Sequence, residues 1–500
     1  MKYNNPVIPG FYPDPSVCRV GEDYYLVNSS FAYFPGIPIW HSKDLVHWRQ
    51  LGYCLTRESQ LQLEKSGVSG GVWAPTIRYH QGRFYMVTTN QDYGGHFYVW
   101  TNDPSGDWSD PIYVDQEGID PSLYFDEDGK VYFTSTGTQS GMGIYQCEID
   151  IETGTKLSES RLIWSGTGGK FPEGPHLFKR NGYYYLMCAE GGTEYGHMET
   201  IARAKTPYGP FESGPMNPIL SHRSLGHPIQ ATGHADLVEA HDGIWWAVFL
   251  GIRPVGYPPR HHLGRETFLA PVHWSEDGWP MIGNNGVVEL EMEAETLSPV
   301  YWENNSEIDH FDEPSLGMHW NFLRNSEKVD WSLSERPGWL ALNGRSVQLK
   351  ERTGTPALIA RRQQHWNCEV SVKMEFQPAE GADAGLTVFM DDSYHYALGL
   401  TMLDGRHFVT LKRQVGSISD EKISLPVLGN VIELKIRALP DKYQFYYQGN
   451  DHEWNLLGEA ETHLLSTEVA GGFTGVFFGM YNYSSLGTTA YFDWFHYKEQ

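Results

Sequence analysis

The chain has 500 residues, which is enough for two or three domains with large cores. Its 53 glycines, 29 prolines and 14% aromatic residues are typical of turn-rich β structure rather than of helical bundles. The formal charge of -25 argues against nucleic acid and anionic membranes as partners, because both are bound through basic patches. A neutral ligand such as a sugar is compatible with this charge.

The first residues of the chain, 1–6, contain no apolar stretch. We therefore expect neither a signal peptide nor a transmembrane helix. The protein is accordingly expected to be cytoplasmic. The five cysteines form no CxxC pair and their number is odd, so we expect small buried residues in a reducing compartment rather than disulfides or a metal site.

One hairpin pattern occurs five times in the first half of the chain. Each copy has a short strand, a turn at or near a glycine, and a strand of alternating aromatic and aliphatic residues. The copies begin at Asp14, Ala74, Asp120, Gly174 and His234. Hairpins that recur at intervals of roughly 40–60 residues predict a β-propeller, here with five blades in which each copy is the inner hairpin.

Further strand-like runs with turns between them lie between the copies. Residues 37–45 and 96–101 are examples, and we expect them to form outer strands of blades. Helix signals are sparse, and residues 56–65 are the segment predicted to form a short helix. The propeller is expected to occupy residues 1–300.

The composition changes near residue 297, and the polar segment 301–308, which contains Asn304 and Asn305, is interpreted as a linker. Short strand-like runs without a repeat follow it, for example residues 357–360, 368–374, 431–436 and 443–447. We therefore predict an all-β protein in which residues 308–500 form a jelly-roll-like β-sandwich.

The first position of each hairpin copy, with the residue before it, is expected to enter the propeller channel from the same rim. Three carboxylates, a tryptophan and a histidine then converge on one axis: Asp14, Trp73, Asp120, Glu173 and His234. Carboxylates that point into a narrow channel repel one another and lose solvation, so chance rarely places them in register. This arrangement indicates a functional site.

Paired carboxylates across a sugar-sized space are the machinery of glycoside hydrolysis. Glu173 lies between Pro172 and Gly174, an environment that raises its pKa and suits a general acid. Asp14 is the candidate general base, and Asp120 is placed to orient the acid and raise its pKa by like charge. Taken singly, Asp14 and Asp120 could each be a turn cap before proline, but their shared register favours catalysis.

The sequence resembles glycoside hydrolase family 43, in the group of exo-acting β-xylosidases and α-L-arabinofuranosidases that carry a C-terminal sandwich. The matching stretches occur in the order found in the family and are residues 5–16, 70–75, 118–122, 173–176, 233–236 and 262–268. The resemblance implies a five-bladed propeller and an inverting mechanism. It implies the roles of general base for Asp14, pKa modulator for Asp120 and general acid for Glu173.

The resemblance also implies the remaining site residues. His234 matches a channel histidine that in relatives binds a cation, often calcium, directly or through water; taken alone, it is more often a satisfied core histidine. The residues matching those that contact the substrate or close its pocket are Phe31, Trp73, Thr193, Arg265 and Phe473, the last in a loop of the sandwich. Phe31 and Trp73 could simply be core, although stacking on a sugar is favoured; core packing competes most strongly for Phe473, and Arg265 could belong to an ordinary ion pair.

The leading hypothesis is therefore an exo-glycosidase that removes single pentoses from the non-reducing ends of xylan-derived oligosaccharides. A β-1,4-xylosidase is placed first, and an α-L-arabinofuranosidase or a dual activity second. A non-catalytic carbohydrate-binding propeller is opposed by the intact set of carboxylates. A retaining fructosyl hydrolase is opposed by the absence of its Asn-Asp-Pro-Asn-type motif. The sequence leaves open the natural substrate, the metal requirement and whether the chain forms a homo-oligomer.

Overall fold

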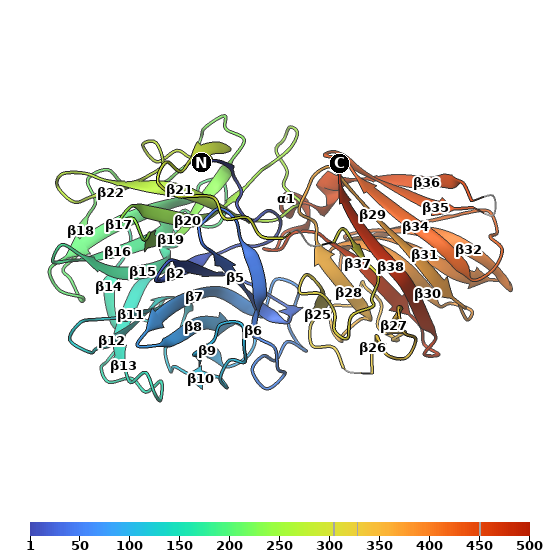
Figure 1. The fold of residues 1–500 in the computed structure, drawn as a ribbon, viewed down its shortest axis with the longest axis horizontal. Coiled ribbons are helices and arrows are strands. Elements are labelled where there is room, and N and C mark those ends of the chain that lie inside the picture. The colour runs from blue at the N-terminus through green and yellow to red at the C-terminus, as the bar shows by residue number, and fades with distance from the viewer. Residues whose placement is uncertain (304–305, 328, 450–451) are drawn as a thin grey trace.

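The computed structural model describes residues 1–303, 306–327, 329–449 and 452–500. It consists of two β domains side by side, with the N-terminus in one and the C-terminus in the other (Figure 1). The all-β prediction is confirmed. Within the described ranges, the helices are too short and too polar to cross a bilayer, and the five cysteines are buried and free.

The first domain is a propeller of five four-stranded sheets, and each sheet takes its strands in chain order. The first three blades are β2 (Ser16–Val20), β3 (Asp23–Val27), β5 (Gly36–Ser42) and β6 (Arg49–Leu55); β7 (Val72–His80), β8 (Arg83–Asn90), β9 (Gly95–Thr101) and β10 (Ile112–Tyr113); and β11 (Ile119–Phe125), β12 (Val131–Gly137), β13 (Gly143–Ile149) and β14 (Arg161–Trp164). The last two are β15 (Glu173–Arg180), β16 (Tyr183–Glu190), β17 (Met198–Ala204) and β18 (Glu212–Ser213); and β19 (Gln230–Glu239), β20 (Trp245–Ile252), β21 (Glu266–Trp274) and β22 (Pro280–Ile282).

The first strand of each blade contacts the first strands of both neighbouring blades, so these five strands line the axis. The predicted repeats are therefore the inner hairpins of five blades. The ring is closed by β1 (Lys2–Asn4), which pairs with β23 (Glu291–Glu293). Next to this pair, the Asn5 amide donates to the carbonyl of Leu269 (3.0 Å) and accepts from its N–H (2.9 Å), as a paired strand would.

The predicted helix at residues 56–65 is wrong, because this segment is a series of turns. Gln60 Oε1 accepts from the backbone N–H groups of Thr56 and Arg57, which holds the first turn together. Leu61 and Leu63 are both fully buried in the core beside blades 1 and 2. Two leucines two positions apart cannot share one face of a helix, so packing selects the turns.

The second domain is a sandwich of two antiparallel sheets. One sheet contains, in spatial order, β26 (Trp331–Ser332), β27 (Leu340–Asn343), β38 (Thr489–Glu499), β29 (Cys368–Phe376), β34 (Val431–Ala438), β35 (Lys442–Gln448) and β36 (Trp454–Glu461), with β24 (Ile308–Asp309) also pairing with β38. The other contains β33 (Ile418–Ile423), β32 (Arg406–Val415), β31 (Tyr394–Leu403), β30 (Asp383–Asp391), β37 (Phe477–Tyr483), β28 (Leu358–Arg362), β25 (Asn321–Leu323) and β4 (Tyr33–Phe34). All four runs predicted as strands in this domain are strands.

The core of the sandwich lies between these sheets. Val370, Val372 and Met374 of β29 are fully buried at alternate positions, which is the pattern of a strand with one face on a core. Strand β4 comes from blade 1 and pairs with β25 of the sandwich, so one sheet continues from the second domain into the first.

The predicted linker lies against the propeller. The Val300 N–H donates to Asp44 Oδ2 (2.7 Å), the Trp302 indole donates to the His47 carbonyl (2.9 Å), and the Arg49 guanidinium stacks 4.1 Å from the Trp302 ring. Asn304 and Asn305 lie outside the described residues. With β4, these contacts fix the sandwich against the propeller and place its loops at the mouth of the channel.

Candidate active site

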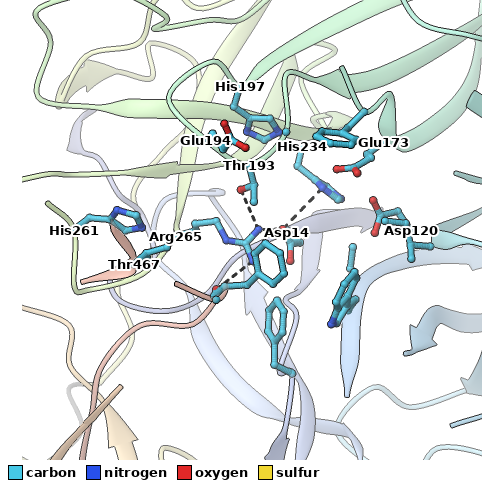
Figure 2. Close-up of a pocket in the computed structure, with 18 residues that line it drawn as sticks. Asp14, Asp120, Glu173, Thr193, Glu194, His197, His234, His261, Arg265 and Thr467 are labelled. Carbon is cyan, nitrogen blue, oxygen red and sulfur yellow. Dashed lines mark hydrogen bonds and ion pairs between the residues drawn. The ribbon is translucent and has the colours of Figure 1, made fainter. Parts of the chain in front are cut away.

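All nine residues singled out from the sequence line one pocket of about 440 Å³ at the rim of the channel (Figure 2). They come from strands and loops of all five blades and from the sandwich: Asp14, Phe31, Trp73, Asp120, Glu173, Thr193, His234, Arg265 and Phe473.

The repeated position at the start of each inner strand has an unusual backbone. Four of the five residues there adopt positive φ, namely Asp14 (53°), Asp120 (54°), Gly174 (57°) and His234 (51°). The strand pairing also shifts register next to the last three of them. Such bulges redirect side chains, and non-glycine residues accept this conformation mainly where surrounding structure enforces it.

In the fourth blade, glycine occupies this position, and the carboxylate precedes it. A Cβ on Gly174 would lie 3.0 Å from Cε1 of His234, so the imidazole packs where a side chain would be. The Gly174 N–H donates to Asp120 Oδ2 (3.1 Å). The blade therefore brings Glu173 beside Asp120 and stabilises negative charge on Asp120.

Asp14 is buried and held in its ionised form. Arg265 Nη1 donates to Asp14 Oδ1 (2.8 Å), and the Ser29 hydroxyl donates to Oδ2 (2.5 Å). Burial alone raises the pKa of Asp14, but the charges of Arg265 and His234 and the hydrogen bond from Ser29 outweigh it, so the net pKa is lowered. Asp14 is thus an anion above acidic pH.

Glu173 and Asp120 have the opposite electrostatics. Burial, with the charge of Asp14, raises the pKa of Glu173 to about 7. Burial, with the charges of Glu173 and Asp14, raises the pKa of Asp120 well above its usual range. Because the two carboxyls repel as anions, the pair retains a proton near neutral pH, and the N–H on Asp120 favours that proton on Glu173.

Arg265 connects Asp14 to the pocket wall. Besides Asp14, Nη1 donates to Thr193 Oγ1 (3.3 Å), and Nη2 donates to the Phe473 carbonyl (3.3 Å). The Phe473 ring lies 6.3 Å from Phe31 and 5.6 Å from Trp73, centroid to centroid. The sandwich loop thus completes an aromatic wall that begins in the propeller, a surface suited to the apolar face of a sugar.

The channel below the pocket contains an arginine. Arg78 donates two hydrogen bonds to Asp236 (2.7 and 3.2 Å) and one to His176 Nδ1 (2.9 Å), and Ser16 also donates to Asp236 (2.6 Å). These side chains come from four blades. Burial raises the pKa of Asp236, but Arg78 and His176 outweigh it and lower the pKa to about 2, so Asp236 is the counterion of Arg78.

His234 is the residue that the resemblance links to a cation, bound directly or through water. The described residues contain no group of three or more His, Cys, Asp or Glu side chains that could hold a metal. The roughly 6–8 oxygen ligands of Ca²⁺ can include waters, so a cation held through water at His234 stays a prediction. His234 Nδ1 lies 3.9 Å from Asp14 Oδ1, and burial lowers the pKa of His234, so the imidazole is neutral near pH 7. We assign no chemical step to a cation.

The pocket also includes residues that the sequence did not predict: Phe171, Glu194, His197, His261 and Thr467. Phe171 lies two positions before Glu173, and His261 directly precedes the matched stretch 262–268. Both are therefore next to residues that the sequence did place in the site. The other three lie on loops or on the sandwich helix α1 (Thr467–Ala470), where no local pattern indicates a pocket.

Residues 3–280 match the family described as glycosyl hydrolases family 43. The chain belongs to glycoside hydrolase family 43. Residues 308–498 match the β-xylosidase C-terminal concanavalin A-like domain, which identifies the type of sandwich. Members of family 43 are glycosidases, and this chain is one, as the resemblance implied.

Family 43 relatives match this chain over its whole length. The non-reducing end α-L-arabinofuranosidase BoGH43B of Bacteroides ovatus is 45% identical over 99% of this chain and 94% of its own length. A β-xylosidase of Bacillus subtilis is 35% identical over 100% of both chains. A solved structure titled Bacteroides ovatus xyloglucan PUL GH43B superposes over 100% of both chains with a TM-score of 0.96 and 43% identity.

Proposed function

We propose that this family 43 glycosidase removes single pentose units from the non-reducing ends of small oligosaccharides with inversion of configuration. One observation supports this most: the pocket contains a carboxyl whose pKa is raised to about 7 and a carboxylate kept ionised by an arginine. An acid and a base with separated pKa values are what glycoside hydrolysis requires.

In this mechanism, Glu173 donates its proton to the glycosidic oxygen while the bond from that oxygen to C1 breaks. Asp14 takes a proton from a water molecule, and the water oxygen bonds to C1 on the opposite face of the sugar. Arg265 keeps Asp14 anionic, and Asp120 keeps the proton on Glu173. Exchange with solvent returns both carboxyls to their starting states.

The shape of the site supports exo action. Phe473 and Thr467 of the sandwich line the same pocket as the propeller carboxylates. The Phe473 N–H donates to Ser69 Oγ (2.9 Å), which fixes this loop to the propeller. A pocket walled by both domains accommodates a chain end, whereas the interior of a long polysaccharide needs an open groove.

The sugar is assigned from the relatives. We place α-L-arabinofuranosyl first, because the relative at 45% identity is named for it. This reverses the order drawn from sequence alone. A β-D-xylosyl unit is the second candidate, because the full-length relative from Bacillus subtilis is named a β-xylosidase.

The test is kcat/KM on 4-nitrophenyl α-L-arabinofuranoside and 4-nitrophenyl β-D-xyloside, followed by chromatography of products from arabinose-substituted xylo-oligosaccharides. We expect faster turnover of the arabinofuranoside, and free arabinose as the only monosaccharide released, together with the oligosaccharide that has lost it. Faster turnover of the xyloside would make xylose the terminal sugar. Turnover of neither pentoside, or release of internal oligomers, would overturn the proposed function. Asp14→Asn is the inactive control.

A further inference from the structure

A carboxylate of the sandwich holds two propeller loops at the edge of the pocket. Glu468 Oε1 accepts from His261 Nδ1 (2.8 Å) and from the Tyr195 hydroxyl (2.8 Å), and Oε2 accepts from the His261 backbone N–H (2.9 Å). Next to Glu468, the Thr467 N–H donates to the His261 carbonyl (3.1 Å). Four hydrogen bonds thus converge on one short segment of α1.

These contacts orient the imidazole of His261. Because Glu468 accepts from Nδ1, this nitrogen carries a proton, and Nε2 is the ring nitrogen left to contact a ligand. Burial raises the pKa of Glu468, but the hydrogen bonds and charge of His261 outweigh it and lower the pKa to about 2, so the carboxylate is a constant acceptor. The ring is 9% exposed and lines the pocket.

Two polar groups of this wall lack a protein partner. Neither Nε2 of His261 nor Oγ1 of Thr467 makes a hydrogen bond within the part of the chain that the structure describes, although both side chains line the pocket. In Figure 2 they lie together on the side of Arg265 away from Glu173 and Asp120. Polar groups of this kind, buried at His261 and partly buried at Thr467, are available for ligand hydroxyls.

We propose that His261 is a sugar-recognition residue, positioned by Glu468, whose Nε2 makes a hydrogen bond with a hydroxyl of the terminal sugar. Thr467 Oγ1 is the second polar contact of the same wall. This assignment rests on the proposed function, in which Glu173 protonates the leaving oxygen. The leaving group therefore lies towards Glu173, and the wall beyond Arg265 faces the far hydroxyls of the terminal sugar.

The consequence is that the sandwich contributes to sugar specificity as well as to pocket shape. A site built to bind a hydroxyl discriminates against a sugar that lacks it, because its own polar group is then left unpaired. Loss of one such hydrogen bond corresponds to roughly tenfold in kcat/KM.

The decisive variant is His261→Asn, whose side-chain amide can still donate to Glu468 as Nδ1 does but has no group at the position of Nε2. It is compared with the unmodified enzyme on 4-nitrophenyl glycosides of whichever pentose is turned over, in which one ring hydroxyl at a time is replaced by hydrogen. Tyr195→Phe is the matched control, because it removes one hydrogen bond to Glu468 without altering His261. Thermal unfolding checks the fold of each variant.

We expect His261→Asn to have a kcat/KM roughly tenfold below that of the unmodified enzyme on the full sugar. On the analogue that lacks the recognised hydroxyl, the two enzymes should have the same kcat/KM. His261→Gln, which returns a polar group near Nε2, should recover part of the loss. The inference is overturned if removal of each hydroxyl lowers kcat/KM by the same factor in His261→Asn as in the unmodified enzyme. It is also overturned if Tyr195→Phe loses as much kcat/KM as His261→Asn. If His261→Asn does not fold, Thr467→Val carries the same test. Failure of the unmodified enzyme on every pentoside would instead overturn the proposed function.

Discussion

The electrostatics of Glu173 predict how the reaction depends on pH and on the leaving group. At pH 6, a carboxyl with a pKa of about 7 is about 90% protonated, and one with the ordinary value of 4.5 is about 3% protonated. Burial beside Asp14 therefore raises the population of the acid about 30-fold at that pH. Above pH 7 the population falls about tenfold per pH unit.

Replacing Glu173 with glutamine keeps the shape of the side chain and removes the transferable proton. On a disaccharide, whose leaving alcohol needs protonation, we expect Glu173→Gln to lose roughly 10²–10⁴-fold in kcat/KM. On a 4-nitrophenyl glycoside, whose leaving group departs largely unaided, the loss should be much smaller. The decrease in kcat/KM above about pH 7, which is the basic limb of the pH profile, should disappear in the variant.

The assay is kcat/KM between pH 5 and 9 for both enzymes on both substrates. Glu173→Asp is the matched control, because it keeps a carboxyl of altered reach and should keep a basic limb. Equal losses of Glu173→Gln on the two substrates would refute the role of Glu173 as the acid. A basic limb that persists unchanged in Glu173→Gln would show that another group titrates.

Three further outcomes follow from the same site. Asp14→Asn should lose activity equally on activated and unactivated substrates, because every substrate needs the water-activating base, and a variant that spares either one contradicts this role. Asp120→Asn should move the basic limb to lower pH, because a like charge that keeps the proton on Glu173 is removed; an unmoved limb in the pH profile would contradict it. Removal of metal ions with EDTA should leave kcat/KM unchanged, because Arg78 and Asp236 already neutralise each other in the channel; a loss restored by Ca²⁺ would refute this.

The propeller and its carboxylates could be predicted because each depends on a local pattern that repeats. Asp14, Asp120 and the Glu173–Gly174 pair each precede a proline at the start of an inner strand, so one hairpin register places them all at one rim. The strands of the sandwich were predictable for a similar reason, since alternate burial in β29 follows alternate apolar residues.

The contacts between the domains could not be predicted in this way. Glu468 lies 207 positions from His261 and 273 from Tyr195 in the sequence, and no periodicity relates a four-residue helix to two propeller loops. Strand β4, which has two residues, is defined by its pairing with β25 rather than by its own sequence. The wall of the pocket beyond Arg265 is therefore a product of tertiary docking.

Whether water attacks C1 directly is tested most directly by the configuration of the first sugar released, followed by proton NMR before mutarotation. Asp14 as base and Glu173 as acid predict inversion, so α-xylose should appear first from a β-D-xyloside and β-arabinose first from an α-L-arabinofuranoside. Initial release of the anomer with retained configuration would contradict these roles, because it requires a carboxylate to bond to C1 before water does.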